Sequence, residues 1–154
     1  MRQTANRSPW SPLSVTIITI FLPVGGIILT VRNMQRLGVL DQTQAWRMSV
    51  SAILISAVGL GIIFGLAPKN SNGFPMVDNS SSYALSIAAA FVCYLAQREP
   101  FKEWRLRNAD ARSGPWLRAI AVGLLYTVLA GLLSAPVWFL SQSVLHTSME
   151  ALAR

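Results

Sequence analysis

Residues 119–149 read AIAVGLLYTVLAGLLSAPVWFLSQSVLHTSM, a run of 31 residues that contains no Asp, Glu, Lys or Arg. Three further runs lack these charged residues: 8–31 with 24 residues, 48–68 with 21 and 79–97 with 19. A helix needs about 20 predominantly apolar residues to cross the roughly 30 Å hydrocarbon core of a bilayer. The four runs therefore predict an all-α fold with four transmembrane helices.

The overall composition agrees with a membrane protein. Of the 154 residues, 53% are hydrophobic and 12% are charged, whereas about 25% of the residues in an average soluble domain are charged. The formal net charge of +7 would suit nucleic acid or an anionic membrane surface, and the four apolar runs favour the membrane. These features exclude a soluble globular domain, a disordered chain and, with one cysteine, a disulfide-stabilised scaffold.

We expect residues 1–154 to form a single integral membrane domain, a four-transmembrane-helix bundle. Prolines near the edges of the apolar runs mark helix ends, because proline lacks the amide hydrogen that a helix in lipid needs. The predicted spans are 13–31, 48–67, 82–97 and 116–140. Trp46 and Trp116 open the second and fourth spans, which allows a duplicated unit of two parallel two-helix hairpins. Chance similarity between apolar helices is the alternative that we favour.

The distribution of basic residues predicts the orientation in the membrane. With four spans, the loops after the first and third spans share one side and hold nine Lys and Arg, whereas the tails and the middle loop hold four. Short cytoplasmic loops carry the excess of Lys and Arg in membrane proteins. We therefore expect a multi-pass protein of the cell membrane with loops 1 and 3 in the cytoplasm and both termini outside. Trp10 would then belong to the aromatic belt of the outer interface.

Each predicted span carries small or polar residues at helical spacing. Helices in lipid associate through close packing of small residues and through hydrogen bonds, since lipid tails are as apolar as leucine. We expect these residues to face neighbouring helices, or one such stripe to mediate contact with a second copy of the chain. The helix-packing candidates are Thr19, Pro23, Gly26, Thr30 and Asn33 in the first span, Gly61 and Gly65 in the second, and Gly123 and Gly131 in the fourth.

The step Pro23-Val24-Gly25-Gly26 is the most unusual backbone feature of the first span. Broken helices bind substrates in some transporters through freed backbone groups, so this step is compatible with a small oligomeric transporter or channel. Proline and glycine are also common in membrane helices, where they admit a close neighbour. We favour close packing as the role of the step.

The predicted spans contain no residue suited to catalysis or proton transfer. Arg118, at the start of the fourth span, is the only Asp, Glu, Lys, Arg or His within them, and ionisable residues deep inside a membrane usually mark ion pathways and proton relays. Cys93 has no basic or acidic neighbour and His146 is the only histidine, so we interpret them as a packing residue and a surface residue. We expect no catalytic residue, no cofactor, no metal and no binding of nucleic acid.

The most polar segment is the predicted third loop, residues 98–112. After Pro100 it could form a short helix that lies among lipid headgroups, with its aromatic side chains toward the acyl chains. Its basic residues would attract anionic lipid. A plain solvated connector that only sets the topology is an equally supported interpretation. The lipid-surface candidates are Phe101, Lys102, Trp104, Arg105, Arg107 and Arg112.

The first span leads into Asn33-Met34-Gln35-Arg36-Leu37-Gly38. A Gly-Gly pair within a helix, then Asn-x-x-Arg-Leu-Gly and a later aromatic and basic run, resembles small bacterial multi-span inner-membrane proteins of unknown function. The resemblance implies a bacterial inner-membrane location and transfers no activity. Together the features predict a non-enzymatic protein, an accessory or scaffold subunit that binds the lipid bilayer, anionic lipid and partner helices or a second copy.

Overall fold

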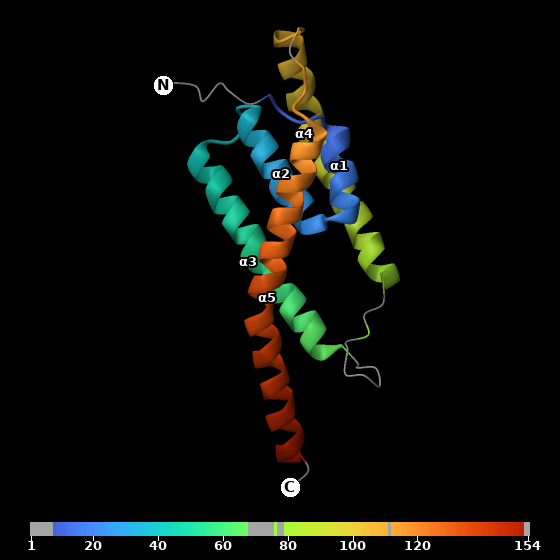
Figure 1. Ribbon diagram of the computed structural model, residues 1–154, viewed down its shortest axis with the longest axis vertical. Helices are drawn as coiled ribbons and strands as arrows, with labels where there is room; N and C mark the ends of the chain where they lie inside the picture. The colour runs from blue at the N-terminus through green and yellow to red at the C-terminus, as the bar shows by residue number, and fades with distance from the viewer. Residues whose placement is uncertain (1–7, 68–75, 77–78, 111, 153–154) are drawn as a thin grey trace.

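The structure is a computed structural model that describes residues 8–67, 76, 79–110 and 112–152. Over these residues it contains five helices and no strand. The helices are α1 (Pro12–Phe21), α2 (Pro23–Arg36), α3 (Gln42–Leu66), α4 (Asn79–Arg107) and α5 (Trp116–Leu152) (Figure 1). The predicted all-α fold is confirmed.

The first apolar run folds into a helical hairpin, so the prediction of one continuous helix over 13–31 is wrong. The chain reverses at Leu22, which lies between α1 and α2 with φ −134° and ψ 70°. A residue before proline is disfavoured in the helical conformation because it collides with the proline ring. Pro23 itself begins α2, at a position where no amide hydrogen is needed. α1 therefore ends at Phe21, and α2 runs back alongside it (Figure 1).

Both ends of this hairpin lie at one end of the molecule. The backbone amide of Trp10 donates to Asn33 Oδ1 at 2.7 Å, although 23 residues of straight helix would separate the two by about 35 Å. With 10 residues, α1 is only about 15 Å long, half the thickness of a hydrocarbon core. The start of α1 and the end of α5 lie at opposite ends of the molecule (Figure 1). The side of a membrane on which each end of the chain lies stays a prediction.

A short turn joins α2 to α3. Gly38 follows α2 with φ 79°, a left-handed conformation that ends many helices and that glycine adopts without steric cost. Asp41 then caps α3: its carboxylate accepts a hydrogen bond from the backbone amide of Gln44 at 2.7 Å, and Gln44 Oε1 accepts one from the amide of Asp41 at 3.1 Å. This reciprocal cap places the start of α3 at Gln42, ahead of the predicted span at 48.

Two helices of the described chain are long and apolar enough to cross a membrane, rather than the four predicted. They are α3 and the Trp116–Val144 part of α5. α3 contains the predicted span 48–67 except its last residue, and α5 contains the whole of 116–140. In their most apolar stretches only 28% and 17% of the residues are buried. Most of their apolar side chains therefore face outward.

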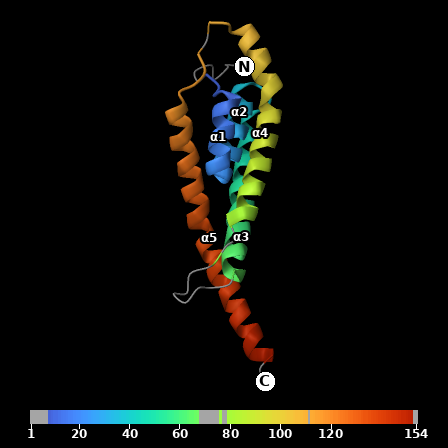
Figure 2. The same ribbon diagram turned by 90° about the vertical axis from the view of Figure 1, so that its right-hand side faces the viewer.

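The hairpin joins two parts of the molecule that otherwise do not touch. α3 packs on α5, and the hairpin lies between α4 and α5 (Figure 2). In the described part of the chain, α4 contacts α1 and α2 but neither α3 nor α5. The prediction of two parallel two-helix hairpins is wrong, because the helices that contain the third and fourth predicted spans are not in contact.

α4 and α5 continue beyond the predicted span ends at 97 and 140. α4 passes through Pro100 to Arg107, and α5 passes through Pro136 to Leu152. Proline removes one backbone hydrogen bond from a helix interior. After Pro100, the residues Lys102, Glu103 and Arg105 are good helix formers and favour continuation of α4. After Pro100, Glu103 and Arg107 form an ion pair of 3.5 Å across one turn, which supports the helix.

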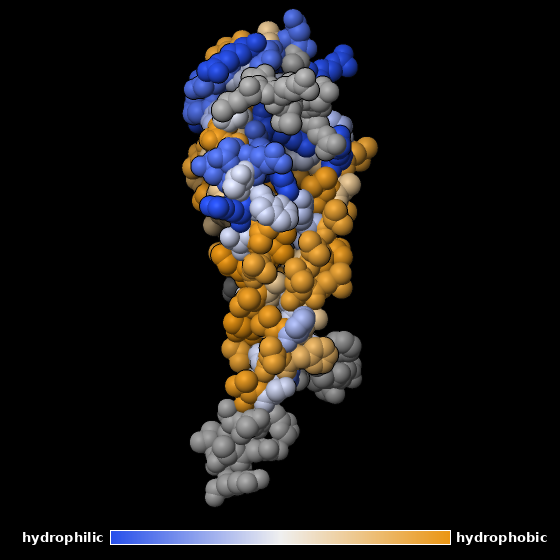
Figure 3. All heavy atoms as spheres, turned by 90° about the vertical axis from the view of Figure 1, so that its left-hand side faces the viewer, coloured by the Kyte–Doolittle hydropathy of each residue, from blue (hydrophilic) through white to orange (hydrophobic). Residues whose placement is uncertain are grey.

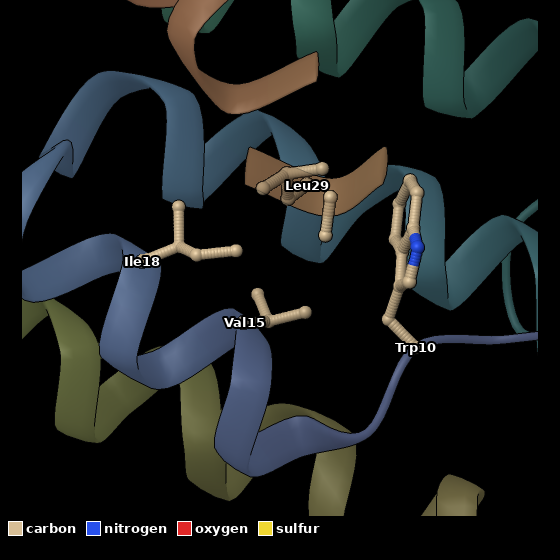
Figure 4. Close-up of a cluster of buried hydrophobic side chains, with 5 residues drawn as sticks. Trp10, Val15, Ile18 and Leu29 are labelled. Carbon is tan, nitrogen blue, oxygen red and sulfur yellow. The ribbon is translucent and has the colours of Figure 1, made fainter. Parts of the chain in front are cut away.

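Two small clusters of buried apolar side chains form the core. The first joins the hairpin to the start of α5 and contains Trp10, Val15, Ile18, Leu29 and Ala119 (Figure 4). The second joins α2 to α3 and α5 and contains Ile28, Ile53 and Ala130. The core therefore surrounds the hairpin.

Hydrophilic residues gather at one end of the molecule, while hydrophobic residues cover its middle (Figure 3). That end holds the α2–α3 turn, the end of α4 and the start of α5 (Figure 1), and we call it the basic end. All Lys and Arg residues of the described chain lie there: Arg32, Arg36, Arg47, Arg98, Lys102, Arg105, Arg107, Arg112 and Arg118.

Candidate functional site

A network of buried amide and hydroxyl groups joins the hairpin to α4. At its centre is Asn33 of α2, which is fully buried. Its Oδ1 accepts from the backbone amide of Trp10 at 2.7 Å, and its Nδ2 donates to the carbonyl oxygen of Trp10 at 2.9 Å. One side chain thus fixes the segment before α1 to the last turns of α2.

Gln97 of α4 completes the network from the other side. Its Oε1 accepts from Asn33 Nδ2 at 2.6 Å. Its Nε2 donates to Thr30 Oγ1 at 3.1 Å and to the carbonyl oxygen of Cys93 at 2.9 Å. The hydroxyl of Thr30 in turn donates to the carbonyl oxygen of Gly26 at 3.0 Å. Residues from three segments, far apart in sequence, therefore share one set of hydrogen bonds.

Both amide groups in this network use all of their N–H donors. Each Nδ2 or Nε2 group has two hydrogens, and Asn33 and Gln97 each make two donor contacts. A buried polar group that loses its partner costs about 1–3 kcal/mol. Because no donor of these amides is left for a ligand, we interpret the network as a structural clamp between the hairpin and α4.

Trp10 also ties the clamp to the basic end. The guanidinium of Arg36 lies 3.6 Å from the centre of the Trp10 ring, a cation–π contact. Arg36 Nη1 donates to the carbonyl oxygen of Ser8 at 3.3 Å. From the α4–α5 connection, the amide of Gly114 donates to the carbonyl oxygen of Pro9 at 2.8 Å. The segment before α1 is thereby held by α2 and by the α4–α5 connection.

The sequence placed Trp10 in an outer aromatic belt, whereas it is 1% exposed and lies at the basic end. That interpretation assumed one straight helix over 13–31, so it is wrong for the same reason as that helix. Gln97 was absent from the candidate residues. The available signal was its position: it ends a charge-free run and lies four residues after Cys93, on the same helix face.

Two packing candidates of the first span, Thr19 and Gly26, face each other across the hairpin, whereas Thr30 and Asn33 contact Gln97 of α4. Gly26 on α2 faces Thr19 on α1, so closely that a Cβ atom at Gly26 would overlap the threonine. Thr19 is fully buried. Pro23 lies at the half-buried turn between the two helices. The break predicted at 23–26 is therefore filled by protein, through contacts within the hairpin and between Gly25 and Gly123 of α5.

The glycines of α3 and α5 occupy different environments. Gly61 and Gly65 lie against α5, where added Cβ atoms would overlap Val137 and Ser141. Gly123 lies against the hairpin: its Cβ would be 3.1 Å from Ile18 Cγ2 and 3.2 Å from Leu29 Cδ1.

Gly131 is exposed, and no atom lies within 4 Å of the position of its Cβ. Among the described residues its predicted role in packing is therefore not fulfilled, because none of the five helices packs against the α5 face on which it lies.

The lipid-surface candidates lie mainly on a helix rather than in a loop. Five of them form the last two turns of α4, and Arg112 follows in the connection to α5. The rings of Phe101 and Trp104 are 5.7 Å apart. This part of α4 projects along the long axis beyond the other helices (Figures 1 and 2). The predicted separate helix parallel to the membrane is therefore wrong, because α4 is continuous through Pro100.

The arrangement shows no reactive centre within the described residues. No three His, Cys, Asp or Glu side chains of this part of the chain lie close enough together to hold a metal ion. The side chain of His146 lies outside the described residues. Cys93 is buried on the face of α4 that packs on the hairpin.

No family model matches this chain, and comparison with curated proteins and with solved structures gave no match.

Proposed function

We propose that this chain is a non-enzymatic integral membrane protein, an accessory or scaffold subunit that binds partner helices and anionic lipid. α3 and α5 would cross the bilayer, together with α4, which does not pass the same length and hydropathy test but whose residues 79–97 carry no charge. The α1–α2 hairpin would enter the bilayer from the basic end and return. The observation that carries this proposal is the outward exposure of the apolar side chains of the long helices.

α4 illustrates that exposure. On the side turned away from the hairpin, Leu85, Phe91 and Val92 are 73%, 61% and 64% exposed. The opposite side carries Ala90, Cys93 and Gln97, all buried against the hairpin. Monomeric soluble proteins rarely leave contiguous apolar surfaces of this extent uncovered, so lipid or partner helices would cover them.

The hairpin also strengthens the case for an orientation. All nine Lys and Arg residues of the described part of the chain lie at the basic end. Since cytoplasmic segments carry the excess of Lys and Arg, we place the basic end in the cytoplasm and the C-terminus outside.

Site-directed photo-crosslinking in native membranes tests the scaffold role. A photoreactive amino acid at Phe91, on the outer side of α4, should give a discrete product heavier than the 16.8 kDa chain. The same amino acid at Ala90, which faces the hairpin, should cross-link only within the chain. If Phe91 and the exposed α5 residue Leu125 both yield only lipid adducts, the scaffold role is contradicted.

The helix break at Leu22 favours one second candidate, a small oligomeric transporter or channel. Against it, Gly25 packs on the backbone of Gly123 and Gly26 on Thr19, so the break is occupied by protein. Reconstituted vesicles that contain an entrapped ion-sensitive dye distinguish the two candidates. A channel would let small ions cross the bilayer and change the fluorescence of the dye, whereas a scaffold subunit would leave the vesicles impermeable.

A further inference from the structure

A shallow, open groove lies on the outer surface between α2 and α3. Its volume is about 360 Å³, and it is lined by Ile27 and Val31 of α2 and by Arg47, Met48, Ser51, Ala52 and Ile55 of α3. Apart from Arg47 and Ser51, these side chains are apolar. The groove is separate from the amide clamp, which faces α4, and from the basic residues in the last two turns of α4.

The sequence explains why the groove is hollow. Arg47, Ser51 and Ile55 follow one another at intervals of four, so they line one face of α3. Small residues, Ser51 and Ala52, occupy the middle, while larger ones, Met48 and Ile55, stand on either side. From Arg47 to Ile55 the helix rises about 12 Å. The lining residues of α3 therefore extend over about two turns of the helix, a length that part of an extended hydrocarbon chain can follow.

Arg47 places a positive charge at one end of the row of α3 residues that line this groove. It is exposed, and it makes no hydrogen bond or ion pair with the other described residues. The acidic residue closest to it in the sequence, Asp41, is engaged in capping α3. Trp46, beside Arg47, is 60% exposed, as expected of a tryptophan at the level of lipid headgroups. A free guanidinium at that level binds phosphate oxygens, in pairs where geometry allows.

We propose that the α2–α3 groove is a binding site for one anionic phospholipid. An acyl chain lies along Ser51 and Ala52 toward Ile55, and Arg47 binds the phosphate of the headgroup. The inference rests on the proposed membrane location of the chain but not on any partner protein. It adds a specific site to the general attraction that the basic end exerts on anionic lipid.

Native mass spectrometry of the full chain in mild detergent tests this site. The probes are phosphatidylglycerol and phosphatidylcholine with identical acyl chains, so that only the headgroups differ. The chain should retain phosphatidylglycerol in preference. Arg47→Gln should lower that retention about tenfold, the loss expected for a hydrogen bond to a charged group. Ser51→Leu, which fills the groove, should lower the retention of both lipids.

Arg118→Gln is the matched control, because it removes one exposed charge from the same end of the molecule but outside the groove. Retention by this variant should fall by no more than about fivefold, the general attraction of one basic residue near a membrane surface. Equal losses for Arg47→Gln and Arg118→Gln would overturn the site in favour of general charge attraction. Unchanged retention in Ser51→Leu would overturn the placement of the acyl chain. Neither result bears on the crosslinking of Phe91, so the scaffold role is tested separately.

Discussion

We expect substitutions of Asn33 and Gln97 to lower the stability of the folded chain strongly, because both side chains are buried and hydrogen-bonded. Asn33→Leu leaves the amide and carbonyl of Trp10 and the Oε1 of Gln97 without partners, each at a cost of about 1–3 kcal/mol. Gln97→Leu has a similar effect on Asn33 and Thr30. Thermal unfolding in detergent should show that each single variant is less stable, and that the double variant loses at least about 1 kcal/mol less than the sum of the two. Strictly additive losses would show that the two amides do not act together.

Gly123 and Gly131 allow the same substitution to be compared at two places on α5. Gly123→Leu places a side chain against Ile18 and Leu29, and overpacking of this kind costs roughly 1–3 kcal/mol. Gly131→Leu adds a side chain where no atom lies within 4 Å, and leucine favours helix over glycine. We expect a lower unfolding temperature for the first variant and an unchanged or higher one for the second. A loss of stability in Gly131→Leu would indicate that this face of α5 packs against a partner.

At the scale of the helices, the end of α4 carries the prediction that involves anionic lipid. Lys102, Arg105, Arg107 and Arg112 are all exposed, and basic residues near a membrane surface contribute about 1 kcal/mol each to binding of anionic lipid. Replacing the four by Gln should weaken retention of phosphatidylglycerol and reduce its dependence on salt. Because Arg47 is unchanged in this variant, the phosphatidylglycerol that binds in the α2–α3 groove should still be retained. If the variant retains as much phosphatidylglycerol as the unmodified chain, these four residues do not bind anionic lipid and serve only to set the topology.

The helices themselves could be predicted from the sequence more readily than their ends. The four charge-free runs predicted where helices would form, because lipid-facing helices exclude charge. The end of α4 was missed since Pro100 was interpreted as a stop, although the Lys, Glu and Arg residues that follow favour helix. The step at 23–26 was noticed, but its geometry depends on contacts across the hairpin, such as Gly26 with Thr19. Contacts of that kind have no signature in a local window of sequence.

At the scale of the whole molecule, one wrong assumption changed several conclusions. A straight first span placed Trp10 and Asn33 on opposite sides of the bilayer, and so hid the clamp. It also placed Arg2 and Arg7 outside, against the trend of the other basic residues. With the hairpin, the buried position of Trp10 and the distribution of Lys and Arg agree with one another. A reporter protein fused after Arg154 should therefore be exported, whereas one fused before Met1 should stay in the cytoplasm.

The re-entrant hairpin is tested most directly by labelling single cysteines with a membrane-impermeant maleimide. The background is Cys93→Ala, and the three positions are Ser8→Cys before α1, Val39→Cys between α2 and α3, and Met76→Cys between α3 and α4, all exposed. Right-side-out and inverted vesicles are compared. We predict that Ser8→Cys and Val39→Cys react in the same vesicles, with Met76→Cys reacting in the opposite ones. Reaction of Ser8→Cys together with Met76→Cys would show that residues 8–36 cross the membrane and would contradict the hairpin.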